Sequence, residues 1–255
     1  MASGAQPTVA AVIPTFNAAA LLPGCLESVA WADEIHVVDL HSTDETAAIC
    51  ARFPQCRLHD QDGFAFARVN YGIDQATTDW VIRIDSDERV TPELAAEMRD
   101  FMRSAPADVT GLACWERLVI LGREMRHGRG ARHHRKLLFR RGAARYAVQY
   151  EHEDLTSTGR WVDSTSGYMH LNYPTVADYL RKTNDYTTLD ADREAPVPPP
   201  AAMRVIRDLL RPMYIYYLRQ RGYRDGWIGF VDAAMMSVYQ LTFWAKRRER
   251  WEARG

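Results

Sequence analysis

Two aspartates, Asp85 and Asp87, flank a single serine, and their type and spacing point most directly to chemistry. They follow a short apolar run, so both carboxylates are expected in a turn at the end of a buried strand. Such carboxylates can hold Mg²⁺ or Mn²⁺ through one or two oxygens while a diphosphate supplies further ligands. The ion would then neutralise charge on a departing nucleotide diphosphate. Because acidic turns are common, this spacing alone is a weak signal.

The elements around these aspartates form an alternating series. Strands are predicted over residues 8–13, 34–38, 57–59 and 80–84, and helices over 18–29, from 42 through 50, and over 66–76. This alternation favours an α/β fold with a mostly parallel sheet flanked by helices, over roughly the first hundred residues. Ligands of such sheets bind beyond the carboxyl ends of the strands. We therefore expect Asp39, Asp85 and Asp87 to converge there.

The remaining chain divides at the proline-rich segment 195–201. Before it, a helix is predicted from Pro92 to about Ser104, then β-rich sequence over 110–139 and a helix over 177–192. The proline-rich segment is predicted to be a rigid linker that separates the two parts of the chain. We expect one α/β domain over residues 1–194 and a basic, aromatic C-terminal extension over residues 201–255, built from two or more amphipathic helices.

Charge is distributed unevenly although the whole chain carries only −1. From Ala201 onward, eleven basic and five acidic residues leave a surplus of six positive charges among tyrosines and tryptophans. This pattern favours an anionic surface as partner, with a membrane as one candidate. The alternative is that the aromatics pack on the main domain and the arginines are solvated. No nucleic-acid partner is expected, because no RNA-binding motif accompanies the basic residues.

The cellular location is predicted from what the sequence contains. Its four cysteines show no CxxC pair, which is typical of reduced thiols in a cytoplasmic protein. Residues 1–7 show no basic region followed by an apolar run, so no secretion signal is predicted. No apolar stretch approaches the roughly 20 residues that span a bilayer. We expect a cytoplasmic protein that meets a membrane, if at all, peripherally at its inner face.

A series of short motifs runs along nearly the whole chain, namely Val12–Asn17, Cys25–Val29, Trp31–Ile35, Val37–Asp39, Ser42–Thr46, Asn70, Trp80–Val90, His152–Glu153, His170, Lys182 with Tyr186, and Arg224–Phe230. In this order they resemble family 2 inverting glycosyltransferases of the GT-A fold. The similarity is strongest to the bacterial branch that adds sugars to the lipopolysaccharide core, typified by β-1,4-glucosyltransferases. Motifs in a fixed order are far more specific than any one of them alone.

The resemblance implies nucleotide-sugar contacts at the strand ends. Asp39 matches the position that hydrogen-bonds the base, and a carboxylate can accept the imide N–H of uracil, so uridine is favoured. The alternative is that Asp39 only caps a turn. Arg68 suits the base or the diphosphate, with a solvated surface arginine as the alternative. The other implied contacts are Pro14, Thr15, Asn17, Asp85 and Ser86, although Asn17, like Asn70, is expected to shape the pocket more than to contact reacting atoms.

Metal and proton-transfer roles are also implied by the resemblance. Asp87 would bind the metal directly, and Asp85 would touch the ribose or the metal. His170 would add a metal or phosphate ligand, with a hydrogen-bonded structural histidine as the alternative. Inverting transfer needs a general base that takes the acceptor proton. Glu153 matches the family's His-Glu position and is the expected base, with Asp154 as runner-up and an acidic patch at a helix start as the alternative.

Some positions depart from the family pattern. The Asp39–Ser42 turn lacks the usual glycine, which is expected to alter the nucleotide edge of the site. Leu137 stands where relatives usually place arginine, so Arg135 or Lys136 is expected to take over a phosphate contact. Three further histidines lie among arginines that disfavour another cation, and we interpret them as a basic loop and not a zinc site: His127, His133 and His134.

These observations predict an inverting, Mn²⁺- or Mg²⁺-dependent transferase. It would move a hexose, with glucose favoured, from a UDP-sugar to a hydroxyl of a glycan, lipid-linked saccharide or other acceptor. A nucleotidyltransferase is the second hypothesis for the function. Such an enzyme usually carries a basic, glycine-rich loop after its first strand, and Pro14–Asn17 is not such a loop. A non-catalytic nucleotide-sugar-binding module of the same fold is the third.

Overall fold

The computed structural model describes residues 6–63, 65–131, 133–147, 155–193 and 202–253. The chain forms two compact units, each described here by itself. The first contains residues 1–116 and 133–170, and the second contains residues 117–132 and 171–255. Segment 201–255, predicted as an extension, therefore lies in one unit with residues 171–193.

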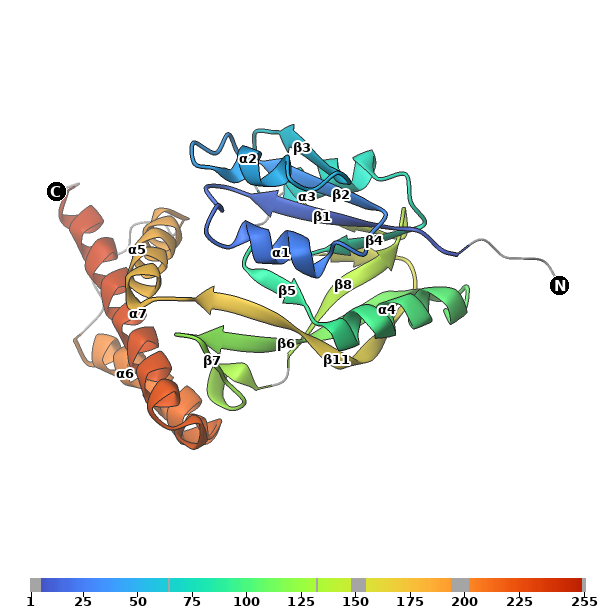
Figure 1. Ribbon diagram of the computed structural model, residues 1–255. Coiled ribbons are helices and arrows are strands. Elements are labelled where there is room, and N and C mark those ends of the chain that lie inside the picture. The colour runs from blue at the N-terminus through green and yellow to red at the C-terminus, as the bar shows by residue number, and fades with distance from the viewer. Residues whose placement is uncertain (1–5, 64, 132, 148–154, 194–201, 254–255) are drawn as a thin grey trace. The chain divides into compact units, whose positions relative to one another are not determined.

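The first unit is built on the parallel strands that the sequence predicts (Figure 1). Their order is β3, β2, β1, β4, and each neighbouring pair is parallel. Valine, isoleucine and alanine dominate β1, as expected for a strand buried on both faces. The bounds are β1 Val9–Thr15, α1 Leu22–Ser28, β2 Glu34–Asp39, α2 Thr46–Cys50, β3 Cys56–Asp60, α3 Ala65–Gln75 and β4 Trp80–Arg83.

Beyond β4 the sheet becomes antiparallel, so the whole sheet is mixed and not mostly parallel. β8 pairs antiparallel with β4, β6 with β8, and β5 with β11. The helix predicted after Pro92 has the expected limits, because Thr91 caps it by accepting a hydrogen bond from the Leu94 amide. The bounds are β5 Glu88–Val90, α4 Pro92–Ser104, β6 Val109–Ile120, β8 His134–Arg140, β9 Ala144–Tyr146, β10 Leu155–Ser157 and β11 Arg160–Tyr173.

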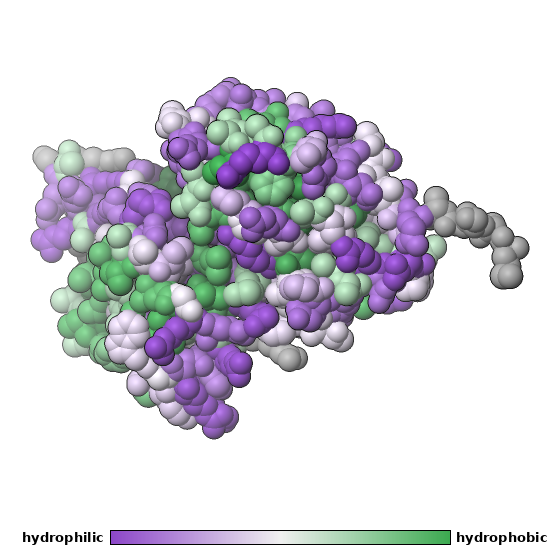
Figure 2. Space-filling view, in the orientation of Figure 1, coloured by the Kyte–Doolittle hydropathy of each residue, from purple (hydrophilic) through white to green (hydrophobic). Residues whose placement is uncertain are grey.

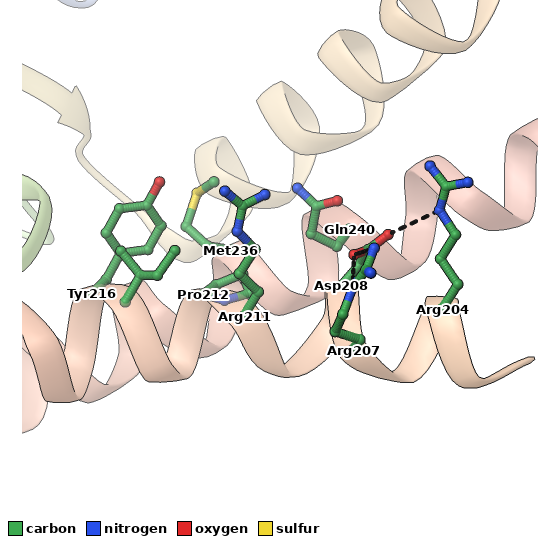
Figure 3. Close-up of a pocket in the computed structure, with 9 residues that line it drawn as sticks. Arg204, Arg207, Asp208, Arg211, Pro212, Tyr216, Met236 and Gln240 are labelled. Atoms are coloured by element: carbon green, nitrogen blue, oxygen red, sulfur yellow. Dashed lines mark hydrogen bonds and ion pairs between the residues drawn. The ribbon is translucent and has the colours of Figure 1, made fainter.

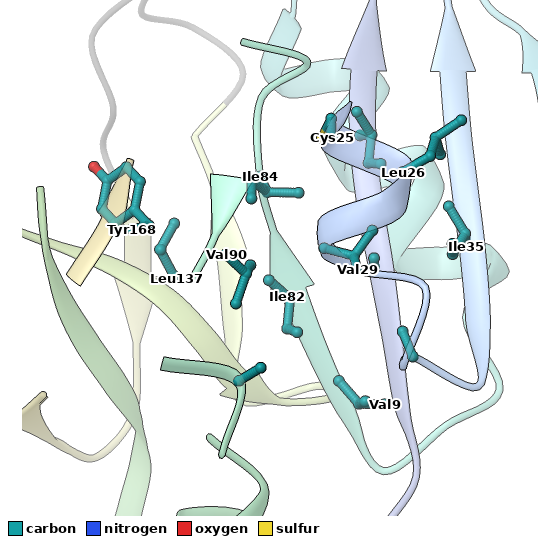
Figure 4. Close-up of a cluster of buried hydrophobic side chains, with 14 of the residues drawn as sticks. Val9, Cys25, Leu26, Val29, Ile35, Ile82, Ile84, Val90, Leu137 and Tyr168 are labelled. Atoms are coloured by element: carbon teal, nitrogen blue, oxygen red, sulfur yellow. The ribbon is translucent and has the colours of Figure 1, made fainter. Parts of the chain in front are cut away.

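Alternate side chains of β1 enter two different cores. Val9, Ala11 and Ile13 pack in a core that also takes residues of α1 and α4, part of which is drawn in Figure 4. Ala10 and Val12 pack in another core with residues of α3. Because both faces of the sheet are covered, the polar side chains that could meet a ligand gather where the strands end.

The second unit is mainly helical. Its core contains Leu118, Ile120, Met125, Tyr173, Tyr179 and Ile228. Arg129 donates to Asp232 over 2.9 Å, and the Tyr179 hydroxyl donates to the same carboxylate oxygen over 2.9 Å. The bounds are β7 Arg123–Glu124, η1 Gly128–Gly130, α5 Val176–Arg193, α6 Ala202–Pro212, the π-helical η2 Met213–Arg219, η3 Gly222–Asp225 and α7 Trp227–Glu252.

The motif Arg224–Phe230 has a structural explanation in the second unit. Asp225 accepts hydrogen bonds from the backbone amides of Arg126 and His127, and from the His127 ring at 2.9 Å. A Cβ at Gly229 would lie 1.9 Å from the Gly222 carbonyl oxygen. The motif therefore fixes a loop onto the start of α7 and lets the η3 backbone approach that helix closely.

The structure also describes the helix lengths and the cysteines that composition brought into question. Among the described residues, no helix is long and apolar enough to cross a membrane. All four cysteines are free, with Cys25, Cys50 and Cys114 buried and Cys56 half-buried.

Candidate active site

Asp39 ties together the ends of β1 and β2. Its Oδ1 accepts hydrogen bonds from the hydroxyls of Thr15 and Ser42, both at 2.7 Å, and its Oδ2 accepts one from the Ser42 amide at 2.6 Å. Asn17 extends the arrangement, because its amide donates to the Ser42 hydroxyl and its side chain accepts from Thr43. Asp39 thus orders a turn, as the alternative reading proposed. An ionised carboxylate offers about four acceptor positions, so one remains on Oδ2.

The turn after Asp39 keeps a left-handed residue without using glycine. His41 has φ of +50°, and its ring lies 3.1 Å from Asp62. A non-glycine residue in this conformation carries a cost of roughly 1–2 kcal/mol. His41 therefore adopts the left-handed conformation that glycine favours, and it places an imidazole at the exposed edge of the turn.

Arg68 on α3 is buried and not solvated, so the surface-arginine alternative is wrong. Its Nη1 donates to the Thr15 carbonyl over 2.5 Å and lies 3.5 Å from the Val38 carbonyl. Burial lowers the pKa of Arg68, while Asp39 and Asp85 oppose that change. The contacts with the Thr15 and Val38 carbonyls hold the Arg68 guanidinium at the carboxyl ends of β1 and β2.

Asp85 is bound by two arginines. Arg83, buried at the end of β4, approaches Oδ1 to 3.0 Å, and Arg135 of β8 approaches Oδ2 to 3.2 Å. Arg135 also pairs with buried Glu88, whose carboxylate accepts the Asp85 amide over 2.8 Å. Burial raises the pKa of Glu88, against the opposing effect of Arg135. Two acids and two arginines thus form a compact network with no net formal charge.

Asp87 faces a different partner, His170. The Asp87 Oδ2 lies 3.7 Å from the His170 Nε2, and the His170 Nδ1 lies 2.5 Å from Glu116. The antiparallel pairing of β5 with β11 sets His170 opposite Glu88 and so brings it to this turn. Burial alone would lower the pKa of His170, but Asp87 and Glu116 raise it to about 10.

This pair fits a divalent metal in part. A gap of 3.7 Å is longer than a hydrogen bond. Two donors bound to one octahedral ion at about 2.1 Å lie roughly 3–4 Å apart, so Asp87 and His170 can share one. In the described part of the chain, no three His, Cys, Asp or Glu side chains are grouped to hold a metal. The residues therefore fit an ion whose other ligands come from a diphosphate or water.

The other predicted residues make separate contacts. Pro14 is buried within β1, and the Ser86 carbonyl accepts a hydrogen bond from Arg89 over 3.0 Å. Asn70 holds the Tyr146 backbone through both its amide atoms, consistent with a role in shaping the pocket. Lys136 lies over the Trp161 ring. Glu153 and Asp154, the expected base and its runner-up, lie outside the described residues.

Sequence reasoning missed two acids of this site. Glu116 lies in the middle of β6, where its neighbours give no sign that it would reach a histidine 54 positions away. Glu88 belongs to the motif Trp80–Val90. The sequence did not indicate a role for it, because its partner Arg135 lies on a different strand, β8. An acid within a strand that enters the core needs a cationic or hydrogen-bonding partner, and this signal could have drawn attention to Glu88.

The Asp85-Ser86-Asp87 turn, His170 and several arginines thus lie together near strand ends of the first unit. The chain belongs to glycosyl transferase family 2, whose model matches residues 10–162. The match includes all the parallel strands and the acidic turn. Family membership establishes the protein as a glycosyltransferase and removes the nucleotidyltransferase alternative.

Individual relatives agree with this assignment. The lipopolysaccharide core biosynthesis glycosyltransferase LpsC of Rhizobium meliloti is 30% identical over 95% of this chain and 92% of its own. A PGL/p-HBAD biosynthesis glycosyltransferase of Mycobacterium tuberculosis is 29% identical over 69% of this chain and 68% of its own.

The solved structure of mannosyltransferase PcManGT from Pyrobaculum calidifontis has a TM-score of 0.55 and 16% identity to this chain. The match covers 95% of this chain and 87% of that one. At this identity the likeness concerns the fold, and it confirms the predicted GT-A architecture.

Proposed function

We propose that this glycosyltransferase is inverting and metal-dependent, and that it moves a hexose, with glucose favoured, from a UDP-sugar to an acceptor hydroxyl. The observation that carries the proposal is the Asp87–His170 pair, placed beside an Asp85 already neutralised by Arg83 and Arg135. The cytoplasm, or the inner face of a membrane, is the proposed location.

Mn²⁺ or Mg²⁺ would be held by the Asp87 carboxylate and by Nε2 of His170. Because Asp87 and Glu116 raise the pKa of His170 to about 10, the ion would have to displace the Nε2 proton. When bound, the ion supplies Lewis-acid stabilisation of charge on the leaving diphosphate. Glu116 acts as a positioning residue, because a proton kept on Nδ1 by this carboxylate leaves Nε2 free for the metal. The structure of PcManGT with GDP-Man and Mn²⁺ supports divalent-metal use in this fold.

Uridine is the proposed base because of the acceptor position that remains on Asp39 Oδ2. The imide N–H of uracil could donate there without displacing Thr15 or Ser42. Arg68, held close to Asp39, would then contribute positive charge near the base or the diphosphate.

A carboxylate base completes the proposed reaction. The acceptor hydroxyl attacks the anomeric carbon as its proton passes to Glu153, the bond to the diphosphate breaks, and the configuration inverts. Asp154 is the second candidate for this base. The names of the R. meliloti and M. tuberculosis relatives refer to lipopolysaccharide core and PGL/p-HBAD biosynthesis, which supports a glycan or a lipid-linked molecule as acceptor.

Calorimetric binding of UDP and a panel of nucleotide-sugars, with and without Mn²⁺, tests the donor site. We expect metal-dependent binding of one UDP-sugar that Asp87→Ala abolishes. Asp100→Ala, which removes an exposed acid of α4, is the matched control and should bind as the wild type does. Unchanged affinity of Asp87→Ala for UDP with Mn²⁺ would contradict the metal assignment.

Turnover assays test the base. Glu153→Gln should keep donor binding and lose on the order of 10²–10⁴ in rate, the scale of general-base loss. Normal turnover in Glu153→Gln would assign the base to Asp154 or another residue. Tight donor binding by the wild type, without turnover of any acceptor, would favour the non-catalytic module.

A further inference from the structure

Helix α6 and the following η2 carry a continuous apolar stripe on their exposed side. Met203, Ile206, Leu210 and Tyr214 are each between 48% and 74% exposed. Their spacing of three, four and four residues places them on one face of a helix. Stripes of this kind normally face a core. Here the stripe faces outward, and it is named the α6 stripe below.

The exposed apolar surface continues beyond α6. Leu218, Tyr223, Trp227 and Phe230 are also exposed. The ring of Tyr217 contacts those of Tyr223 and Phe230 edge to face, which joins the end of η2 to the start of α7. Figure 2 shows hydrophobic surface gathered over the α6 and α7 region. Large contiguous patches of this kind mark interaction sites in folded proteins.

Folding of the second unit does not require this stripe to be covered. The opposite face of α6 meets α7, with Val205 and Leu209 half-buried and Pro212 buried. The helix is therefore held in place by one face, while the other remains available to a partner.

Three arginines run alongside the stripe. Arg204, Arg207 and Arg211 line a pocket of about 340 Å³ that Gln240 of α7 also lines. Figure 3 shows the ion pairs of Asp208 with Arg204 and Arg207. Arg211 makes no ion pair within the described part of the chain. The pocket thus keeps a surplus of positive charge directly beside an apolar stripe.

We propose that the α6 stripe docks in the plane of an anionic lipid bilayer. The apolar side chains would enter the boundary between headgroups and acyl chains, and the arginine row would lie at headgroup depth. The aromatic residues at the start of α7 suit the same interface. A second copy of this chain is the weaker occupant, because it would bring another surplus of positive charge to the contact.

Flotation of the full chain with vesicles tests this proposal. We expect binding to vesicles of phosphatidylglycerol mixed with phosphatidylcholine, weaker binding in high salt, and little binding to phosphatidylcholine alone. Ile206→Gln/Leu210→Gln should lower partition about tenfold or more. Arg207→Gln/Arg211→Gln should lower it about tenfold.

The matched control is Leu180→Gln/Leu189→Gln. It replaces two exposed leucines of α5, in the same unit, that do not share a helix face. This variant should bind as the wild type does. Equal loss in the control, or no binding of the wild type to anionic vesicles, would overturn the proposal.

Sedimentation velocity distinguishes self-association of the chain from binding to a lipid surface. A dimer that dissociates in Ile206→Gln/Leu210→Gln would assign the stripe to self-association and overturn the proposal, whereas a monomer that binds vesicles supports it. Because flotation needs no donor, Asp87→Ala should bind vesicles normally. Failure of the membrane proposal and failure of the proposed function are therefore distinguishable.

Discussion

Asp85 and Asp87 lie two residues apart in the sequence but contact different side chains. Asp85 is fixed between Arg83 and Arg135, while Asp87 faces His170 across a gap that a metal ion can fill. The acidic motif therefore combines a structural acid that neutralises two arginines with an acid that faces His170.

Removing the charge of Asp85 should destabilise the fold as well as the site. In Asp85→Asn, buried Arg83 loses its ion-pair partner, and such a loss typically costs about 3–5 kcal/mol. Urea unfolding without nucleotide measures the effect. Asp87→Asn, at the neighbouring acid that faces His170, is the matched control, and its loss should be much smaller. Equal stability of the two variants would refute the structural role of Asp85.

Glu34 gives the fold a defined dependence on acid. Burial would raise its pKa, but hydrogen bonds from Thr77 and His36 lower it to about 2. A depressed folded-state pKa contributes stability above the unfolded value, near pH 4.5, and this is lost as pH falls toward 2. Glu34→Gln should therefore cost about 1–3 kcal/mol at pH 6 and little near pH 2.

Urea titrations from pH 2 to 7 measure that difference. Thr77→Val removes one of the donors and should show a smaller loss over the same pH range. A cost of Glu34→Gln that stays constant with pH would show that packing, and not the carboxylate charge, makes the contribution.

At the scale of elements, close backbone approach fixes the start of α7. Alanine favours a helix over glycine by about 1 kcal/mol, yet the Cβ of Gly229→Ala would meet the Gly222 carbonyl oxygen, which cannot move aside alone. We expect a net loss of about 1–3 kcal/mol in unfolding free energy. Thr242→Ala, at a half-buried position of the same helix where the hydroxyl donates to the Val238 carbonyl, is the control and should be nearly neutral. An unchanged stability of Gly229→Ala would mean that η3 can shift.

The predictable elements were those with a strong local pattern. The apolar runs that became β1, β2 and β4 and the capped start of α4 were all visible in the sequence. β5 is only three residues long and β11 mixes polar with apolar residues, so neither carries a clear period. Because β5 and β11 bring His170 to Asp87, the contacts of the site were less predictable than its residue types.

At the scale of the whole molecule, the C-terminal segment belongs to a core. Ile228 packs with Leu118, Ile120, Tyr173 and other residues from before the proline-rich segment. Asp232 of α7 also pairs with Arg129. A chain that ends at Pro200 would expose these groups, and we expect it to aggregate.

Size-exclusion chromatography and circular dichroism of the truncated chain measure this outcome. The full chain with Ile206→Gln/Leu210→Gln is the control, because it removes apolar surface from α6 without uncovering the core of the second unit. A truncated chain that stays monomeric and folded would show that residues 201–255 are separable from the rest.

The core of the second unit also has a consequence for synthesis on the ribosome. Ile120 and Ile228 belong to one cluster, yet roughly a hundred residues separate them. At a translation rate of about 5–20 residues per second, the nascent hairpin around β7 waits on the order of ten seconds for its helical partner. Sequence changes that speed or slow elongation between these segments should therefore alter the yield of soluble protein without changing the folded product.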